Sequence, residues 1–243
     1  MKDATHYTSE DWLVYGDVAE PSTREKMILL AIEEIIEFGP ADFNAMHTCD
    51  RLGIKHPMVN YYFGNRDGLI AEATWWCYEQ WAKQVDRIFH DTYSSPEKRL
   101  KAFVKGEIAF AEKLGAMHIL MHYPLTSKGA EALVNEKYQD QMQRIFEYHL
   151  ALIAVTVGDI RSHTYTDIDF SVDSYPRSQL ILKPGLVTAA TKIAWMTHGI
   201  ANWSAGKHVA TTRIASDVAQ DLTLGLVTRD YVKSILAMAR GKL

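Results

Sequence analysis

The sequence is poor in the features that identify several large protein classes. It holds only two cysteines in 243 residues, Cys49 and Cys77, too few for a disulfide framework or a cysteine-rich zinc site. The longest apolar runs, such as residues 150–157, fall well short of the ~20 residues that span a bilayer. The first eleven residues carry three acids where a secretory signal would need an apolar stretch. These absences predict a soluble, cytoplasmic protein.

Sequence motifs of common enzyme classes are also missing. There is no Gly-rich phosphate loop, no Gly-x-Ser-x-Gly nucleophile turn and no His-Glu-x-x-His zinc motif. The sequence therefore predicts a protein that is not an enzyme and holds no cofactor. An all-helical enzyme that uses scattered histidines and aspartates stays open as an alternative. A mobility shift on promoter DNA, set against a substrate screen, would separate the two.

The net charge of −4 gives no sign of a nucleic-acid binder until its distribution is considered. Residues 1–21 contain one base and five acids, so residues 22–243 are neutral overall. Local clusters of bases therefore decide whether the chain can bind nucleic acid. Residues 22–70 contain five bases and seven acids. Four of these bases lie at the starts of expected helices, where backbone N–H groups add to phosphate binding. They are Arg24, Lys26, Lys55 and Arg66.

Apolar residues recur at helical spacing along most of the chain, and no strand-turn-strand pattern occurs, which predicts an all-α fold. Residues 1–21 lack a sustained period and are expected to form an N-terminal arm. Ser22 with Glu25 fits a capping box, and Gly39-Pro40 ends the helix that it opens. The other expected helices run from Asn44 to Leu52 and over about 54–63, 65–89, 96–114, 117–122, 138–153, 184–208 and 216–239. Residues 158–183 are expected to form a loop with a little extended structure.

The first three helices, with Gly53 at the tight turn between the second and third, predict a helix-turn-helix. Val59 and Phe63 lie four residues apart and are expected to anchor the third helix to the core. The other face mixes a base, an amide and phenols, which suits a helix in the major groove. Asn bonds adenine, Lys reads guanine and Tyr reaches phosphate. The predicted DNA contacts are Arg24, Lys55, His56, Pro57, Asn60, Tyr61, Tyr62 and Arg66.

Three linked segments resemble the TetR family of bacterial regulators in order and spacing. They are Thr23-Arg24-Glu25, the run of residues 53–63, and Asn65-Arg66-Asp67-Gly68-Leu69, and the resemblance covers roughly residues 22–75. It implies a DNA-binding domain followed by a helical domain that binds a small effector and dimerises. Asn60 stands where the family commonly has a phosphate-binding Tyr, and Lys55 where a small capping residue is usual. Thr48 replaces a common core aliphatic residue. The operator sequence therefore does not follow from the family.

The resemblance and the helix pattern together predict three parts and a function. An arm over 1–21 precedes a helix-turn-helix domain over 22–66 and a helical effector-binding and dimerisation domain over 67–243. The expected function is a DNA-binding transcriptional regulator, a repressor that a small molecule releases from its operator. A DNA-binding architectural protein without an effector stays open as an alternative. It would have no pocket and no ligand-dependent release.

The helical segments after residue 66 are rich in aromatic residues and methionine, which are expected to form a helical interior. Its aromatic members include Trp75, Trp76, Trp81, Trp195 and Trp203. A cavity in such an interior would favour a flat or apolar ligand. The candidate effector contacts are Phe103, Phe110, Met117, His118, Met121, Tyr138, Met142, Phe146, Trp195 and His198.

His118 and His122 are spaced to share one helix face, and with His149 or His198 they could ligate a metal. No cysteine or compact carboxylate cluster accompanies them in the sequence. The prediction is therefore polar side chains in or near an aromatic pocket, and no metal.

The last two expected helices lack a single polar face. Over 184–208, Leu186 and Ala190 mark one apolar side, and Val187 and Ala194 mark another. A helix that is apolar on two sides is buried on two sides. This predicts a homodimer formed by the last two helices. Small residues would permit close approach of the subunits: Ala189, Ala190, Ala194 and Ala201. Burial within one subunit is the alternative.

Overall fold

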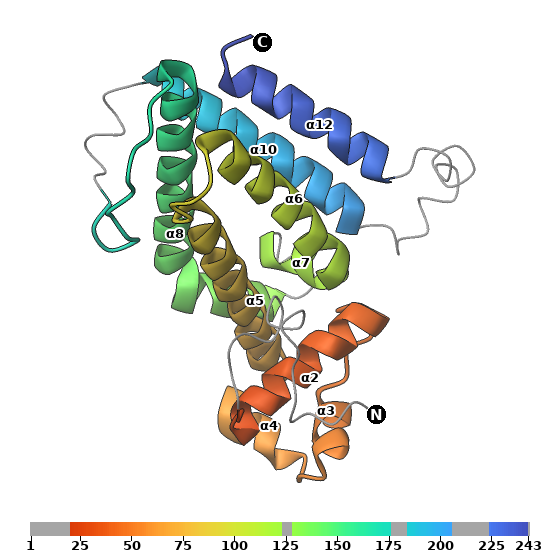
Figure 1. Ribbon diagram of the computed structural model, residues 1–243. Helices are drawn as coiled ribbons and strands as arrows, with labels where there is room; N and C mark the ends of the chain where they lie inside the picture. Colours follow the sequence, from red (N-terminus) through yellow and green to blue (C-terminus); the bar gives the residue numbers. More distant parts are fainter. Residues whose placement is uncertain (1–19, 123–127, 176–183, 206–223, 243) are drawn as a thin grey trace. The chain divides into compact units, whose positions relative to one another are not determined.

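The computed structural model describes residues 20–122, 128–175, 184–205 and 224–242. Within these residues the chain forms nine α-helices and no strand, which confirms the predicted all-α fold (Figure 1). None of the described helices combines the length and the apolar character that crossing a membrane requires. Residues 1–19 of the expected arm over 1–21, and the parts of the last two expected helices between 206 and 223, lie outside the described residues.

The chain divides into two compact units. Unit 1 comprises residues 1–82 and 113–139, and unit 2 comprises residues 83–112 and 140–243. The backbone passes from one unit to the other inside three long helices, α5 (Arg66–Phe89), α6 (Pro96–Leu114) and α8 (Lys128–Ser162). The functional division predicted at residue 66 stays a prediction.

Helix α2 (Thr23–Phe38) begins and ends at the residues that its sequence predicts. The Ser22 backbone N donates to a Glu25 carboxylate oxygen over 2.7 Å, and the Glu25 N donates to the Ser22 hydroxyl over 3.3 Å. These two bonds form the expected capping box and satisfy donors that the first helical turn leaves open. At the other end Gly39 takes a φ of 81°, so the chain turns there. One side of α2 is fully buried and includes Met27, Ile28 and Ile32.

The turn between α3 (Ala45–Leu52) and α4 (Pro57–Phe63) is built around Gly53. Gly53 adopts the left-handed conformation with a φ of 65°, which a side chain would strain. The backbone N of Ile54 donates to the Cys49 carbonyl over 3.0 Å. That bond makes Ile54 part of the cap of α3, so α4 begins at Pro57 and not at the expected residue 54. Proline suits this first position because its missing N–H needs no partner there.

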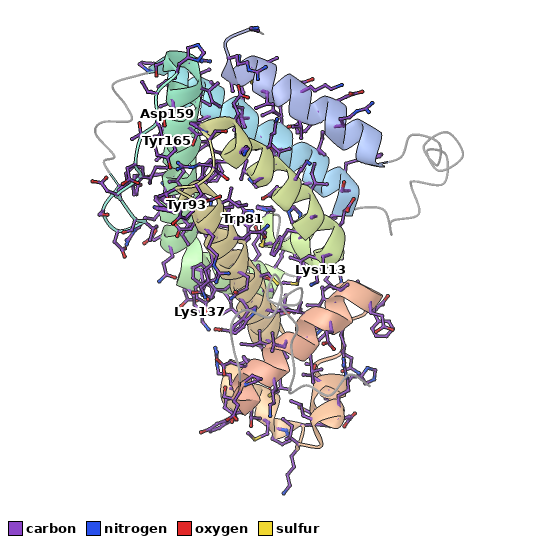
Figure 2. All side chains as sticks on the ribbon, viewed as in Figure 1. Trp81, Tyr93, Lys113, Lys137, Asp159 and Tyr165 are labelled. Atoms are coloured by element: carbon purple, nitrogen blue, oxygen red, sulfur yellow. The ribbon has the colours of Figure 1, made fainter. Side chains whose placement is uncertain are left out.

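Helices α5 and α7 (Ala116–His122) complete the interior of unit 1. The side-chain Oδ1 atom of Asn65 accepts from the Gly68 backbone N over 2.8 Å, as expected for a cap of α5. The apolar side of α5 is buried from Leu69 to Trp81, and Trp81 is 2% exposed (Figure 2). Helix α2 packs against both α3 and α7. The N-terminal helices therefore join the rest of unit 1 through α2.

Unit 2 is built from the end of α5, most of α6, the longer part of α8, α10 (Pro184–Ala205) and α12 (Leu224–Ala239), with α10 and α12 packed side by side (Figure 1). Helix α8 continues to Ser162, so the expected break at Gly158 is wrong. A Cβ atom at Gly158 would lie 3.2 Å from the Leu186 side chain of α10. The glycine thus permits close packing of two helices, which outweighs its helix penalty of about 1 kcal/mol.

The described part of the loop after α8 holds no strand, and the expected extended structure is absent from residues 163–175. The alternation that suggested it reflects one buried residue, Ile168, between two exposed aspartates. The Asp159 carboxylate holds the start of this loop, accepting from the Thr164 hydroxyl over 3.1 Å and from the Thr166 backbone N over 2.8 Å. Asp159 and Tyr165 mark this end of α8 in Figure 2.

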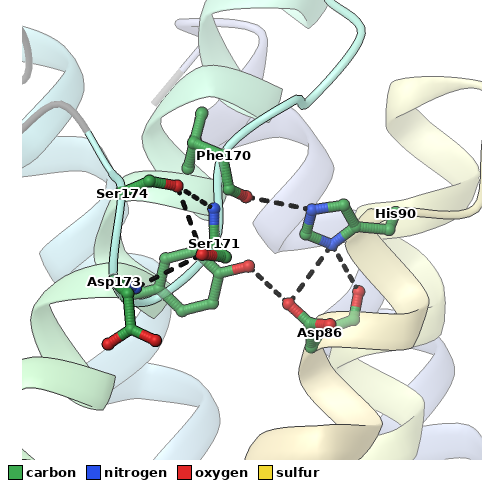
Figure 3. A network of polar contacts seen from close by, with 7 residues as sticks. Asp86, His90, Phe170, Ser171, Asp173 and Ser174 are labelled. Atoms are coloured by element: carbon green, nitrogen blue, oxygen red, sulfur yellow. Dashed lines mark hydrogen bonds and ion pairs between the residues drawn. The ribbon is translucent and has the colours of Figure 1, made fainter.

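The far end of the same loop is held by a polar network on α5 and α8 (Figure 3). The Phe170 carbonyl lies 3.2 Å from the Nε2 atom of His90, whose Nδ1 atom lies 3.3 Å from the Asp86 carboxylate. The same carboxylate accepts a hydrogen bond from the Tyr148 hydroxyl. Burial and the acceptor beside it both raise the pKa of Tyr148, so this phenol stays protonated. The loop is thus fixed to unit 2 at both of its described ends.

Two expectations about α10 are wrong. Trp195 and Trp203 do not belong to the interior, because their exposed fractions are 69% and 49%. The small residues of α10 are also not exposed on the surface, where a second subunit could contact them. Ala189, Ala190, Ala194 and Ala201 are all buried within the chain itself, on the side of α10 that packs into unit 2. The alternative of burial within one subunit therefore holds for the side of α10 that carries these alanines. The side that carries Trp195 and Trp203 is exposed to solvent.

Helix α12 differs from its expected pattern in another way, because its described side chains do form one polar face. Val232, Ile235, Leu236 and Ala239 are buried at helical spacing. The outer side carries Asp230, whose carboxylate lies 3.1 Å from the Lys233 ammonium and 3.7 Å from Arg229. This is the amphipathic pattern of a helix covered on one side only.

Candidate DNA-binding surface

Helices α2, α3 and α4 together form a tri-helical segment over residues 23–63. Its third helix, α4, has one buried and one exposed face. Val59 and Phe63 are each 6% exposed, which confirms the predicted anchor. The opposite side is open to solvent, as predicted, and Tyr61 on this side is 76% exposed. The exposed residues of this side and of the turn before it are Lys55, His56, Pro57, Asn60 and Tyr61. Because Val59 and Phe63 anchor α4 to the core, the exposed side chains of α4 keep defined positions relative to one another.

Some of the outward side chains already contact other residues of the protein. His56 is paired with Asp50 of α3, with 2.8 Å between the Nε2 atom and a carboxylate oxygen. This contact orients the imidazole ring across the turn. Tyr62 is half-buried, and its ring meets the Tyr61 ring edge-on with 4.9 Å between centroids. Tyr62 thereby restricts the positions that the Tyr61 ring can take.

Arg66, expected to bind phosphate, braces the loop between α2 and α3. Its Nε atom donates to the Phe43 carbonyl over 3.0 Å, and an Nη atom donates to the Pro40 carbonyl over 2.7 Å. The guanidinium also lies over the Phe43 ring, 5.5 Å from its centroid, and 3.6 Å from the Asp67 carboxylate. The phosphate contact of Arg66 stays a prediction, and the structure adds a second role that the sequence did not indicate.

Arg24 is likewise engaged within the protein. Its guanidinium forms an ion pair with Glu72 of α5 and lies over the Phe63 ring, 5.4 Å from the centroid. About two-fifths of its side chain remains exposed, at 41%. The pairing of Glu72 with Arg24 could not be predicted from the sequence pattern. The available signal was an acid within the apolar stripe of α5, two residues after Ile70 and one before Ala73.

A second buried acid that the sequence pattern does not reveal is Glu34 on α2. It is 3% exposed, and its Oε2 atom has no hydrogen-bond partner among the described residues. Burial raises the pKa of Glu34, and the nearby His47 and Arg51 of α3 lower it by less. The side chain therefore lies where α2 faces α3, behind the candidate DNA-binding surface.

The candidate effector residues fall into both units. Met117, His118 and Met121 are buried in unit 1 and Tyr138 is half-buried there, while Phe103 and Phe110 are buried in unit 2. Met142, Phe146 and His198 are half-buried in unit 2. Only Trp195 points outward.

The two histidines among these candidates have defined neighbours within their own unit. The rings of His118 and His122 lie 4.8 Å apart, on the shared helix face that their spacing predicts. The His198 Nδ1 atom lies 3.0 Å from the Glu107 carboxylate. The effector role of His118 and of His198 stays a prediction.

Comparisons with known proteins point to regulators of transcription. No family model matches the chain. It is similar to the HTH-type transcriptional regulator BetI of Stenotrophomonas maltophilia, with 31% identity over 87 residues, which cover 36% of this chain and 44% of that protein. It is also similar to the HTH-type transcriptional regulator BetI 1 of Chromohalobacter salexigens, with 26% identity over 87 residues, or 36% and 43% of the two chains. The match thus spans less than half the length of these curated relatives.

Proposed function

We propose that this chain is a DNA-binding transcriptional regulator that places α4 in the major groove of its operator. The observation that carries the proposal is the two-sided α4, anchored by Val59 and Phe63 behind a left-handed glycine turn and open on its other side. The names of the two relatives support the same function. The geometry has the parts of a helix-turn-helix: a supporting helix, a sharp turn and a helix that can enter the groove.

In this proposal the exposed side chains contact different parts of the DNA. The Asn60 amide can donate to and accept from an adenine edge, and the Lys55 ammonium can donate to guanine. Tyr61, with its ring held by Tyr62, can donate to a phosphate oxygen. Arg24 and Arg66 are fixed by contacts with the protein, so they can meet phosphates without losing side-chain freedom on binding.

A homodimer is part of the proposal, and α10 supplies its contact. Trp195, Met196 and Trp203 are 69%, 40% and 49% exposed on one side of that helix. Large apolar residues that gather on an exposed helix face mark an interaction site. A two-fold dimer would present two α4 helices to half-sites about one helical turn apart, so the operator would be near-palindromic.

The proposed control is release from the operator by a small molecule, which is apolar or aromatic. The aromatic and methionine side chains in the interior of both units support this ligand class. Such a ligand shifts the equilibrium only if it binds the released conformation more tightly than the DNA-bound one. Ligand-independent binding would favour the architectural alternative.

Selection of bound fragments from random double-stranded DNA, followed by footprinting, tests the proposed function directly. The expected result is a near-palindromic site. Asn60→Ala should relax the base preference at one position of each half-site by about 1–3 kcal/mol. The matched control is Asn135→Ala, which removes an exposed amide from α8. An Asn60→Ala/Tyr61→Ala variant that binds the selected site as tightly as the wild type would refute α4 as the reading helix.

A further inference from the structure

Glu72 is a buried carboxylate that receives donors from two different helices of unit 1. Only 8% of the residue is exposed. Its Oε2 atom pairs with the Arg24 guanidinium of α2. Its Oε1 atom accepts from the Tyr138 hydroxyl over 2.7 Å and lies 3.2 Å from the Lys137 ammonium, both on α8. Each carboxylate oxygen is therefore assigned to a different helix. A buried carboxylate whose two oxygens both accept from donors on other helices has a defined orientation.

We propose that Glu72 and Tyr138 are positioning residues of the DNA-binding surface, which hold Arg24 and the back of α4 in register with α8. The inference rests on the proposed function and adds to it a residue outside the tri-helical segment. Neither side chain is expected to touch DNA. Their effect passes through Arg24, which they fix beside α4.

The link from Glu72 to α4 runs through one cation–π contact. The Arg24 guanidinium lies 5.4 Å from the centroid of the Phe63 ring. Phe63 is the last residue of α4 and one of its two buried anchors. The Arg24 guanidinium thus forms an ion pair with Glu72, while its flat face lies over the Phe63 ring that anchors α4. Loss of the Glu72 contact would free a long side chain that now supports the end of α4.

The α8 side of the link is held by two further contacts. The Tyr138 ring stacks on the Trp75 ring, with centroids 4.7 Å apart and planes within 5°. Trp75 lies three residues after Glu72, on the same face of α5. At the start of α8, a Cβ atom at Gly129 would lie 2.1 Å from the Asp67 carboxylate, so the backbone of α8 meets the first turn of α5 directly. Lys137, the second α8 donor, is labelled in Figure 2.

Glu72 is ionised under ordinary conditions, as this role requires. Burial alone would raise the pKa of Glu72, but the hydrogen bonds from Tyr138 and Arg24 and the Arg24 charge outweigh it, so the pKa lies below its ordinary value. The pKa of Tyr138 is raised by burial and by its bond to this carboxylate, which keeps the phenol protonated as the donor. The pair therefore keeps one arrangement across the neutral range.

The test removes one hydroxyl and measures its effect on DNA binding. Tyr138→Phe keeps the stacked ring and deletes only the donor to Glu72. The matched control is Tyr148→Phe, which deletes a phenol hydroxyl that donates to Asp86 in unit 2. Operator dissociation constants are measured by fluorescence anisotropy on the full-length chain, well below the unfolding temperature of each variant. Tyr138→Phe should weaken operator binding about fivefold, the factor that one net hydrogen bond gives, and Tyr148→Phe should not weaken it.

A purely structural role is separated by a double-mutant cycle. If Tyr138 acts through Arg24, its removal should cost operator affinity nothing once Arg24 is already Ala, because coupled residues are non-additive. Additive losses, or equal affinities of Tyr138→Phe and Tyr148→Phe, overturn the inference while leaving the proposed function intact. A wild type without sequence-specific DNA binding overturns the proposed function and this inference with it.

Discussion

Replacing Glu34 by leucine should stabilise this protein, although most substitutions of buried residues destabilise. Glu34 is 3% exposed on α2, and its Oε2 atom has no hydrogen-bond partner among the described residues. A buried acceptor without a donor costs about 1–3 kcal/mol relative to an apolar group of similar shape. Leucine fits the same helix position and removes this cost. Glu34→Leu should therefore raise the free energy of unfolding by about 1–3 kcal/mol at pH 8.

The gain should depend on pH in a defined direction. Burial raises the pKa of Glu34 above its ordinary value. A carboxyl whose pKa is higher in the folded state favours folding below its unfolded pKa and loses that contribution as the pH rises through its folded pKa. The wild type thus bears the full cost of the buried charge at pH 8 and a smaller cost at pH 5. The difference between Glu34→Leu and wild type should shrink on acidification.

Thermal unfolding followed by circular dichroism at pH 5 and pH 8 measures this directly. A chain of this length shifts its Tm by roughly 2–4 °C per kcal/mol, so a rise of roughly 2–12 °C is expected at pH 8. Glu37→Leu is the matched control, because it makes the same change at an exposed position one turn later. It should change stability by less than about 0.5 kcal/mol. A Glu34→Leu variant less stable than wild type at pH 8 would refute the reasoning.

Two further predictions concern the DNA-binding surface and the dimer. Arg66→Ala should lower the free energy of unfolding by about 1–3 kcal/mol, since it removes the brace between Arg66 and two backbone carbonyls. It should also reduce the slope of log binding constant against log salt by about 1, the change expected when one phosphate contact is lost. A destabilised variant with an unchanged salt slope would leave Arg66 as a brace alone. Trp195→Glu/Trp203→Glu should sediment as a monomer at micromolar concentration and bind operator far more weakly than wild type. A variant that remains dimeric would exclude the exposed side of α10 as the subunit contact, and Asp230→Ala on α12 serves as its control.

The tri-helical segment could be predicted from sequence because its signals are local. Ser22 and Glu25 reveal a helix start through a reciprocal hydrogen bond that spans three residues. Gly53 marks a turn because glycine adopts a left-handed conformation at little cost. Val59 and Phe63 identify the buried side of α4 by their spacing alone. None of these inferences requires knowledge of a distant part of the chain.

The features that could not be predicted depend on a partner far along the chain. Gly158 signals a break in isolation, yet it is a contact with Leu186 on α10. Trp195 has the composition of an interior residue, and only the packing of α10 shows that it points outward. The acid at position 72 is explained by Arg24, 48 residues earlier, and by Tyr138, 66 residues later. Periodicity finds the buried side of a helix, but it does not identify the neighbour that covers it.

The distribution of charge on the candidate DNA-binding surface indicates that the proposed dimer contributes much of the affinity for DNA. Arg24 is neutralised in part by Glu72, and His56 is paired with Asp50. Lys55 has no ion-pair partner in the part of the chain that the structure describes. A single surface with so few available cations releases few counterions and gains little non-specific affinity. Joining two copies makes the second contact intramolecular, which raises affinity by orders of magnitude without added charge. Specific affinity should therefore fall sharply when α10 is disrupted, even though α10 lies outside the tri-helical segment.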